Sequence, residues 1–146
     1  MKYLRNDLRE EYERIAKNVP DIEGLQHPLI NFSDVLHAYF ILADYFTDES
    51  SDNIEHMLVG LRSADLLGSA LGRQIVSFGG RKKYTDSIEI CATLFYGLVK
   101  DHAFHDGNKR TALLTLLYQL TLYGYIPSVK KEINMKNWWL LLRHIQ

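Results

Sequence analysis

The 146-residue sequence has little cysteine, little proline and almost no net charge. Its one cysteine, Cys91, cannot form an internal disulfide, which favours a reducing, cytoplasmic compartment, and its setting between Ile90 and Ala92 predicts a small buried residue. Three prolines and nine glycines argue against long disordered tracts. Seventeen basic against eighteen acidic residues give a formal net charge of -1. That balance excludes the strong basic field of a nucleic-acid coat or a polybasic membrane binder, so we expect neither nucleic acid nor membrane as a partner.

The sequence also lacks an uninterrupted apolar segment. The run from Thr111 to Val129 carries no charge, but Thr115 and Gln119 interrupt it, and Gly124 and Pro127 stand near its end. A membrane span needs about twenty predominantly apolar residues, so this run predicts a buried helix that Gly124 ends. The first residues contain no apolar core of a secretory signal, so none is expected.

Apolar residues recur at helical spacing through most of the chain, which predicts an all-α fold. We expect one domain over residues 1–146, with a helical N-terminal extension over 1–31 and a core over 32–146. Because the chain stops within an apolar pattern, we expect the native protein to continue beyond Gln146. The expected helices run from Leu4 to Val19, from an N-cap at Ser33 to Phe46, from Asn53 to Leu71 with a break near Gly60, from a cap at Asp86 to Lys100, along the uncharged run, and from about Asn134.

One stretch departs from the helical pattern and predicts a small β-hairpin. A β-branched and aromatic arm precedes two glycines, and a second short arm follows from Arg81 to Tyr84. The residues of the first arm and turn are Ile75, Val76, Ser77, Phe78, Gly79 and Gly80.

The densest group of polar residues is the segment from His102 to Arg110, which joins two apolar helices. Backbone N–H groups at the start of the second helix lack intrahelical partners and attract anions. Gly107 allows close approach of a ligand, and Asn108, Lys109 and Arg110 supply donors. A carboxylate able to hold Mg²⁺, Asp106, and a possible proton acceptor, His102, stand beside them. A base, a metal carboxylate and an anion cradle together indicate transfer of a phosphorus-centred group.

Two other interpretations remain open from the residues alone. The segment could be a solvated connector capped by Asp106 or Asn108. Alternatively, His105 with Asp106 resembles the paired metal ligands of all-helical His-Asp phosphohydrolases, which would need further ligands such as His56 and Asp65.

The segment His102 to Arg110 resembles the signature of the Fic/Doc superfamily, His-x-Phe-x-(Asp/Asn)-(Gly/Ala)-Asn-(Gly/Lys)-Arg. The resemblance covers roughly residues 32–145 and is strongest with the Doc-like (death-on-curing) branch. Further similar segments are Gly60 to Arg62, Leu66 to Leu71, Phe78 to Gly80 with Tyr84, Leu98 to Asp101 and Thr111 to Leu113. The resemblance implies a helical Fic/Doc fold that uses ATP and Mg²⁺ to modify a hydroxyl of a protein.

The resemblance also implies a role for each motif residue. His102 would be the general base, Phe104 a buried anchor and Asp106 the Mg²⁺ ligand, whereas Gly107, Asn108 and Arg110 would hold nucleotide phosphates. Residues 75–84 would correspond to a flap that docks the target by β-strand addition.

Two positions depart from the commonest form of the motif. Ala103 replaces the usual proline, and this change does not affect any of the chemical roles of the motif. Lys109 replaces the second glycine of adenylyl-transferring Fic proteins, where it would obstruct the α- and β-phosphates and place a cation beside the outer phosphates. Lys109 therefore favours phosphorylation by a Doc-like toxin kinase, with adenylylation (AMPylation) as the alternative and a catalytically idle interaction module as the second.

The resemblance further implies partners. The target of a Doc-like kinase would be a protein such as a translation factor. An inhibitory helix of the kind found in many Fic proteins is matched imperfectly by residues 51–56 and 85–90, so a separate antitoxin protein is the expected inhibitor.

Overall fold

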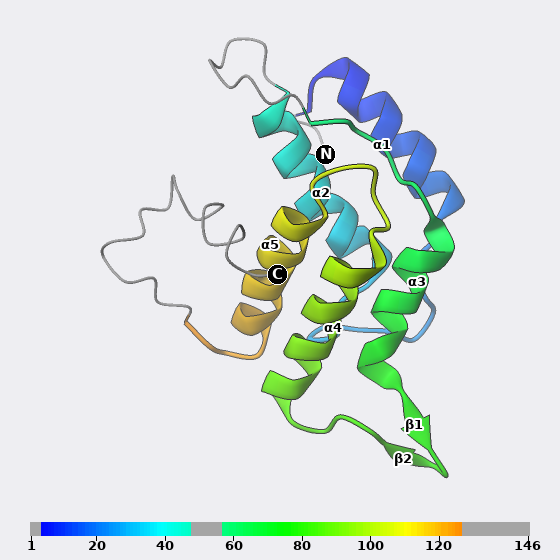
Figure 1. The fold of residues 1–146 in the computed structure, drawn as a ribbon, viewed down its shortest axis with the longest axis vertical. Helices are drawn as coiled ribbons and strands as arrows, with labels where there is room; N and C mark the ends of the chain where they lie inside the picture. The colour runs from blue at the N-terminus through cyan, green and yellow to red at the C-terminus, as the bar shows by residue number, and fades with distance from the viewer. Residues whose placement is uncertain (1–3, 48–56, 127–146) are drawn as a thin grey trace.

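The computed structural model describes residues 4–47 and 57–126, which form a mostly helical structure with one small antiparallel hairpin (Figure 1). This architecture confirms the predicted fold class. The elements are α1 (Asn6–Asn18), α2 (Phe32–Phe46), α3 (Ala64–Gly72), the 3-10 helix η1 (Arg73–Ile75), β1 (Ser77–Phe78), β2 (Arg81–Lys82), α4 (Ser87–Asp101) and α5 (Asn108–Leu122).

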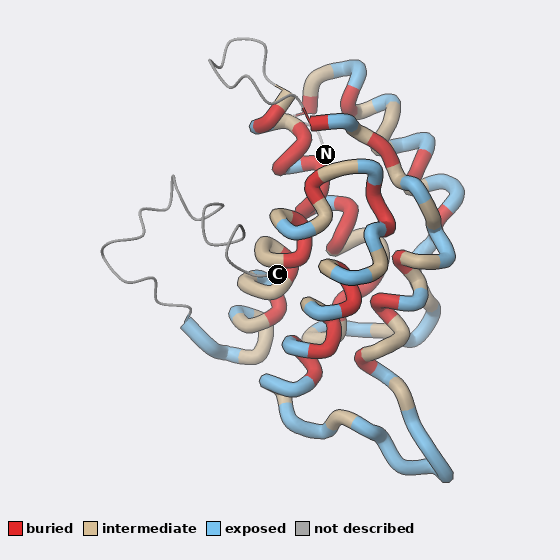
Figure 2. The backbone as a smooth tube through the Cα atoms, in the orientation of Figure 1, coloured by how far each residue is buried: buried red, intermediate tan, exposed pale blue. Residues whose placement is uncertain are grey.

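The helices pack around one apolar core. α4 lies between α5 and α3, while α2 packs against α5 and carries α1 on its other side (Figure 1). Figure 2 shows the buried stretches of α2, α3 and α4 within this bundle, whereas the hairpin is exposed along its length. The largest fully buried side chains include Tyr39 and Phe40 of α2, Leu67 and Leu71 of α3, and Leu94 of α4.

The uncharged run forms α5, and its polar residues have structural roles. Gln119 is fully buried, and its Nε2 donates to Pro28 O at 3.1 Å and to Gln74 Oε1 at 2.9 Å. Gln74 in turn binds both backbone groups of Ile30, each at 2.9 Å. These bonds tie α5 to the loop before α2. Within the described residues, no helix has the length and apolar character needed to cross a membrane.

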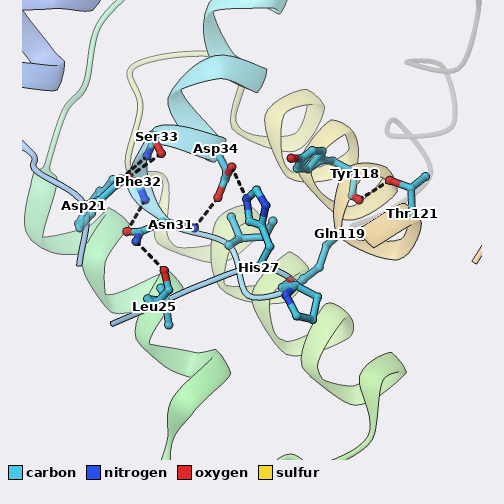
Figure 3. Close-up of polar contacts among 12 residues, drawn as sticks. Asp21, Leu25, His27, Asn31, Phe32, Ser33, Asp34, Tyr118, Gln119 and Thr121 are labelled. Carbon is cyan, nitrogen blue, oxygen red and sulfur yellow. Dashed lines mark hydrogen bonds and ion pairs between the residues drawn. The ribbon is translucent and has the colours of Figure 1, made fainter. Parts of the chain in front are cut away.

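The start of α2 differs from the prediction, because Asn31 and not Ser33 is its N-cap (Figure 3). The Oδ1 of Asn31 accepts from Ile22 N at 2.8 Å and from Phe32 N at 2.9 Å, and its Nδ2 donates to Ile22 O and Leu25 O. Asp34 Oδ2 completes the capping box by accepting from Asn31 N at 2.9 Å. One buried amide therefore both caps α2 and holds the loop that precedes it.

Ser33 has a different role from the predicted one. Its N–H and its hydroxyl donate to Oδ1 and Oδ2 of Asp21, each at 2.8 Å, on the exposed side of the same loop (Figure 3). The prediction chose Ser33 because the sequence does not reveal that the loop folds back onto Asn31.

Two further predictions need correction. Residues 57–63 are not helical, and the helix predicted there begins only at Ala64, with Ser63 as N-cap accepting from Leu66 N at 3.1 Å. In the hairpin, Ile75 belongs to η1 and Val76 lies outside both strands, although Val76 O still accepts from Lys83 N at 2.8 Å. The start of the predicted Asn53 helix and the predicted helix from about Asn134 lie outside the described residues.

Cys91 confirms its predicted burial, since only 1% of its surface is exposed within α4. Burial raises the pKa of the Cys91 thiol to about 11. The thiol therefore stays protonated near neutral pH and acts as a small apolar side chain.

Substitutions at Asn31 and at Ser33 test which of the two residues is the N-cap of α2. Replacing Asn31 by Ala leaves Ile22 and Phe32 without their partner and should lower the free energy of unfolding by about 2 kcal/mol. Replacing Ser33 by Ala removes one exposed hydroxyl and should cost about 0.5 kcal/mol or less. Urea unfolding of the two variants measures the difference, and equal losses would contradict the assignment of the cap.

Candidate active site

The motif segment is the loop that reverses the chain between α4 and α5. His102 ends α4 in the left-handed conformation, with φ 51° and ψ 51°, and Gly107 begins α5 in the same region, with φ 76° and ψ 16°. Glycine adopts this conformation freely, whereas a histidine there costs on the order of 1 kcal/mol or more. Other contacts must therefore hold His102 in place. Both His102 and His105 are exposed.

Phe104 lies in the core, where it is 2% exposed and stacks on Tyr39 with ring centroids 4.0 Å apart. Asn108, the first residue of α5, binds the loop backbone with its side chain. Its Nδ2 donates to Phe104 O at 2.9 Å, and its Oδ1 accepts from Phe104 N at 3.0 Å. The Asn108 side chain thus fixes the loop backbone, so the predicted phosphate contact of Asn108 would have to use its main-chain N–H.

The segment before α3 pairs with the loop along its length. Gly60 O accepts from His105 N at 3.0 Å, and Leu61 forms an isolated antiparallel bridge with Phe104. Gly60 has a φ of 153°, and a Cβ there would lie 2.9 Å from the His105 ring. The backbone conformation therefore favours glycine at this position, and a larger residue would also require the exposed His105 ring to move.

Tyr39 connects this supporting segment to α2. Its hydroxyl accepts from Gly60 N at 2.7 Å while its ring carries Phe104. Burial raises the pKa of Tyr39 to about 12, an effect larger than the opposing hydrogen bond from Gly60. The phenol therefore stays neutral over the physiological pH range, and its bond to Gly60 does not depend on pH there.

Asp106 lies half-buried in the loop with its carboxylate held by two backbone groups. Gly107 N donates to Oδ1 at 2.8 Å, and Leu58 N donates to Oδ2 at 3.3 Å. One lone pair of each oxygen remains for another ligand. Since Mg²⁺ is commonly bound by one or two carboxylates together with substrate phosphates and water, Asp106 fits this metal.

A cage of protein ligands does not form in the part of the chain that the structure describes. No group of three or more His, Cys, Asp and Glu side chains is placed to hold a metal there. The His-Asp phosphohydrolase alternative therefore gains no support from the described residues, and His56 lies outside them.

The N-terminus of α5 has the charge pattern of an anion site. Its first turn contains Lys109 and Arg110 and no acidic residue, whereas α1 to α4 each carry an acidic residue in the first turn. Cations at this end oppose the helix dipole, so the pattern does not stabilise the isolated helix. The first intrahelical bond runs from Thr111 N to Gly107 O, and the N–H groups of Asn108 and Lys109 precede it. N–H groups at this position of a helix lack intrahelical acceptors and attract anions.

The two cations of this turn differ in their surroundings. Lys109 is exposed, whereas the Arg110 guanidinium lies over the Phe46 ring of α2, with Cζ 4.1 Å from the ring centroid. Stacking on an aromatic face fixes the plane of a guanidinium and leaves its edge N–H groups able to donate.

The hairpin does not join the other candidate residues. It precedes α4, while the motif loop follows α4 at the other end (Figure 1). With 15 residues, α4 is about 22 Å long. The structure thus places Ser77, Phe78, Gly79 and Gly80 at the opposite end of the bundle from His102. This placement does not support their predicted role as a flap beside His102.

Four supporting residues were missed as parts of the site: Tyr39, Phe46, Leu58 and Arg62. In the sequence, Tyr39 and Phe46 can be recognised only as buried residues, because apolar spacing indicates that a side chain is buried and not which residue it contacts. Arg62 lies in a segment that resembles the family, and this was the one available signal.

A model of the Fic/DOC family matches residues 29–120. Because the match covers more than half of the chain, the protein belongs to the Fic/DOC family. Members of this family are typically transferases that use nucleotide substrates with Mg²⁺. No curated protein and no solved structure shows significant similarity to the chain.

The contact between Tyr39 and Gly60 gives a test of the supporting segment. Tyr39→Phe keeps the stack on Phe104 but leaves the buried Gly60 N–H without its acceptor, which should cost about 1–3 kcal/mol of unfolding free energy. Tyr45→Phe on the exposed side of α2 is the matched control and should cost about 0.5 kcal/mol or less. Thermal or urea unfolding compares them, and a Tyr39→Phe variant as stable as the control would contradict the contact.

Proposed function

We propose that this protein is a Doc-like kinase that transfers the γ-phosphate of ATP to a Ser, Thr or Tyr hydroxyl of a protein target. The observation that carries the proposal is the first turn of α5, which combines the backbone N–H groups of a helix N-terminus, two cations and no acidic residue directly after Asp106. A helix end of this kind favours a polyanion such as a nucleotide triphosphate.

His102 supplies the base in this proposal. It stands exposed at the start of the same loop, where a hydroxyl from another protein can reach its ring from solvent. The imidazole takes the hydroxyl proton while the hydroxyl oxygen forms a bond to the γ-phosphorus and the bond to the ADP oxygen breaks. ADP leaves, and the proton on His102 then passes to solvent.

Asp106 would hold Mg²⁺ through the free lone pairs of its carboxylate. When bound, the ion would neutralise charge on the phosphate oxygens. The two backbone N–H groups that fix Asp106 orient the carboxylate before the nucleotide arrives.

Lys109 favours the kinase over the adenylyltransferase. Its exposed ammonium on the first turn of α5 can pair with the outer phosphates, and its bulk opposes the placement of α- and β-phosphates against the turn. The target protein is expected to be a translation factor, and an antitoxin protein is the expected inhibitor.

Labelled ATP distinguishes the proposed reaction from its alternatives. Wild-type protein in a cell lysate should transfer label to protein from γ-labelled ATP and not from α-labelled ATP. His102→Ala should lower this transfer by about 10²-fold or more, because the base is lost. His105→Ala, which removes the other exposed histidine of the loop, is the control and should retain transfer.

The alternatives give different results. Transfer from α-labelled ATP that depends on His102 would establish adenylylation instead. An interaction module without catalysis would give no transfer from either label, in wild type or variants.

The metal role of Asp106 has its own test. Asp106→Asn keeps an oxygen acceptor but removes the charge, so the Mg²⁺ concentration for half-maximal transfer should rise by about 10-fold or more. Asp101→Asn, at the end of α4 on the other side of His102, should leave it within about twofold. An unchanged Mg²⁺ dependence in Asp106→Asn would exclude Asp106 as the ligand.

A further inference from the structure

Arg62 contacts the end of α4 with its side chain and its main chain. Its Nε donates to His102 O at 2.8 Å, and its Nη2 donates to Asp101 O at 3.2 Å. Its backbone N–H donates to Ala103 O at 2.7 Å, and Ser63 N reaches the same oxygen at 3.0 Å. One arginine thus binds three successive carbonyls, centred on the histidine of the motif.

These carbonyls belong to the end of a helix, where C=O groups lack intrahelical donors and the dipole is negative. A guanidinium suits such a helix end, because its positive charge opposes the negative dipole and its several coplanar N–H groups can donate to the free carbonyls. The bonds to Asp101 O and His102 O fix the two peptide units that flank the Cα of His102. They therefore hold the left-handed conformation of a residue that does not favour it.

We infer that Arg62 is a positioning residue for His102: its guanidinium locks the left-handed turn that directs the imidazole of the catalytic base. The inference rests on the proposed function for its kinetic consequence, but the placement of His102 can be measured without ATP. Because the Arg62 side chain is largely exposed, its removal should leave the bundle folded.

A second arginine provides a matched control. Arg73 also donates to the backbone of α4, with Nε 3.1 Å from Thr93 O, and it lies over the Tyr96 ring. Its contact is with the middle of the helix and not with its end. Loss of Arg73 should therefore affect stability without moving His102.

The first measurement is the nuclear magnetic resonance spectrum of protein with isotope-labelled histidine rings, and His102→Ala assigns the His102 signals. In Arg62→Ala these signals should shift towards those of a free, mobile histidine, and in Arg73→Ala they should stay in place. Arg62→Lys should give an intermediate result, because one ammonium cannot bind both carbonyls in the geometry of a guanidinium.

The second measurement is steady-state phosphate transfer. Arg62→Ala should lower kcat by roughly 10- to 100-fold, since a misplaced base loses its alignment, while KM for ATP stays within about twofold. An unchanged His102 spectrum in Arg62→Ala overturns the inference, as does a loss of kcat no greater than that of Arg73→Ala. If wild type itself shows no transfer that depends on His102, the proposed function fails, and the spectra alone then decide the role of Arg62.

Discussion

The reversal of the chain between α4 and α5 is the constraint on which the candidate site depends. Two left-handed residues, His102 and Gly107, make the reversal, and Phe104 between them is held in the core by Tyr39. Because α4 and α5 pack side by side, the C-terminus of one and the N-terminus of the other open at the same end of the bundle (Figure 1). The proposed base at the first helix end and the proposed anion site at the second are thereby brought into one short loop.

Much of the fold follows from local sequence patterns. The helices α1, α4 and α5 were predicted close to their bounds, because their signals are local. These signals are the apolar spacing, the cap of α4 at Asp86, and Gly124 just after the end of α5. The start of α2 was wrong because the choice between Asn31 and Ser33 depends on a loop that folds back from Ile22. Residues 57–63 looked helical from their apolar content, yet they pair with the motif loop instead.

The site was predictable where its residues are contiguous in the sequence, but not where they are contributed by distant parts of the chain. His102, Phe104, Asp106 and Gly107 lie in one motif, and the structure keeps them in one loop. The supporting residues Tyr39 and Arg62 come from other elements, and only the folded chain shows that they bind Gly60 and the end of α4. The hairpin itself follows from local signals, whereas its predicted flap role depends on its distance from the loop, which its neighbours along the chain do not reveal.

In the proposed reaction, the first turn of α5 binds the phosphates of the nucleotide. Amide resonances of the labelled protein, followed while ATP and Mg²⁺ are added together, measure this binding residue by residue. We expect the largest shifts on the N–H groups of residues 107–110, whereas those of Ser77 to Lys82 should stay unchanged. Shifts centred on the hairpin, or no shifts at all at saturating ATP, would contradict it.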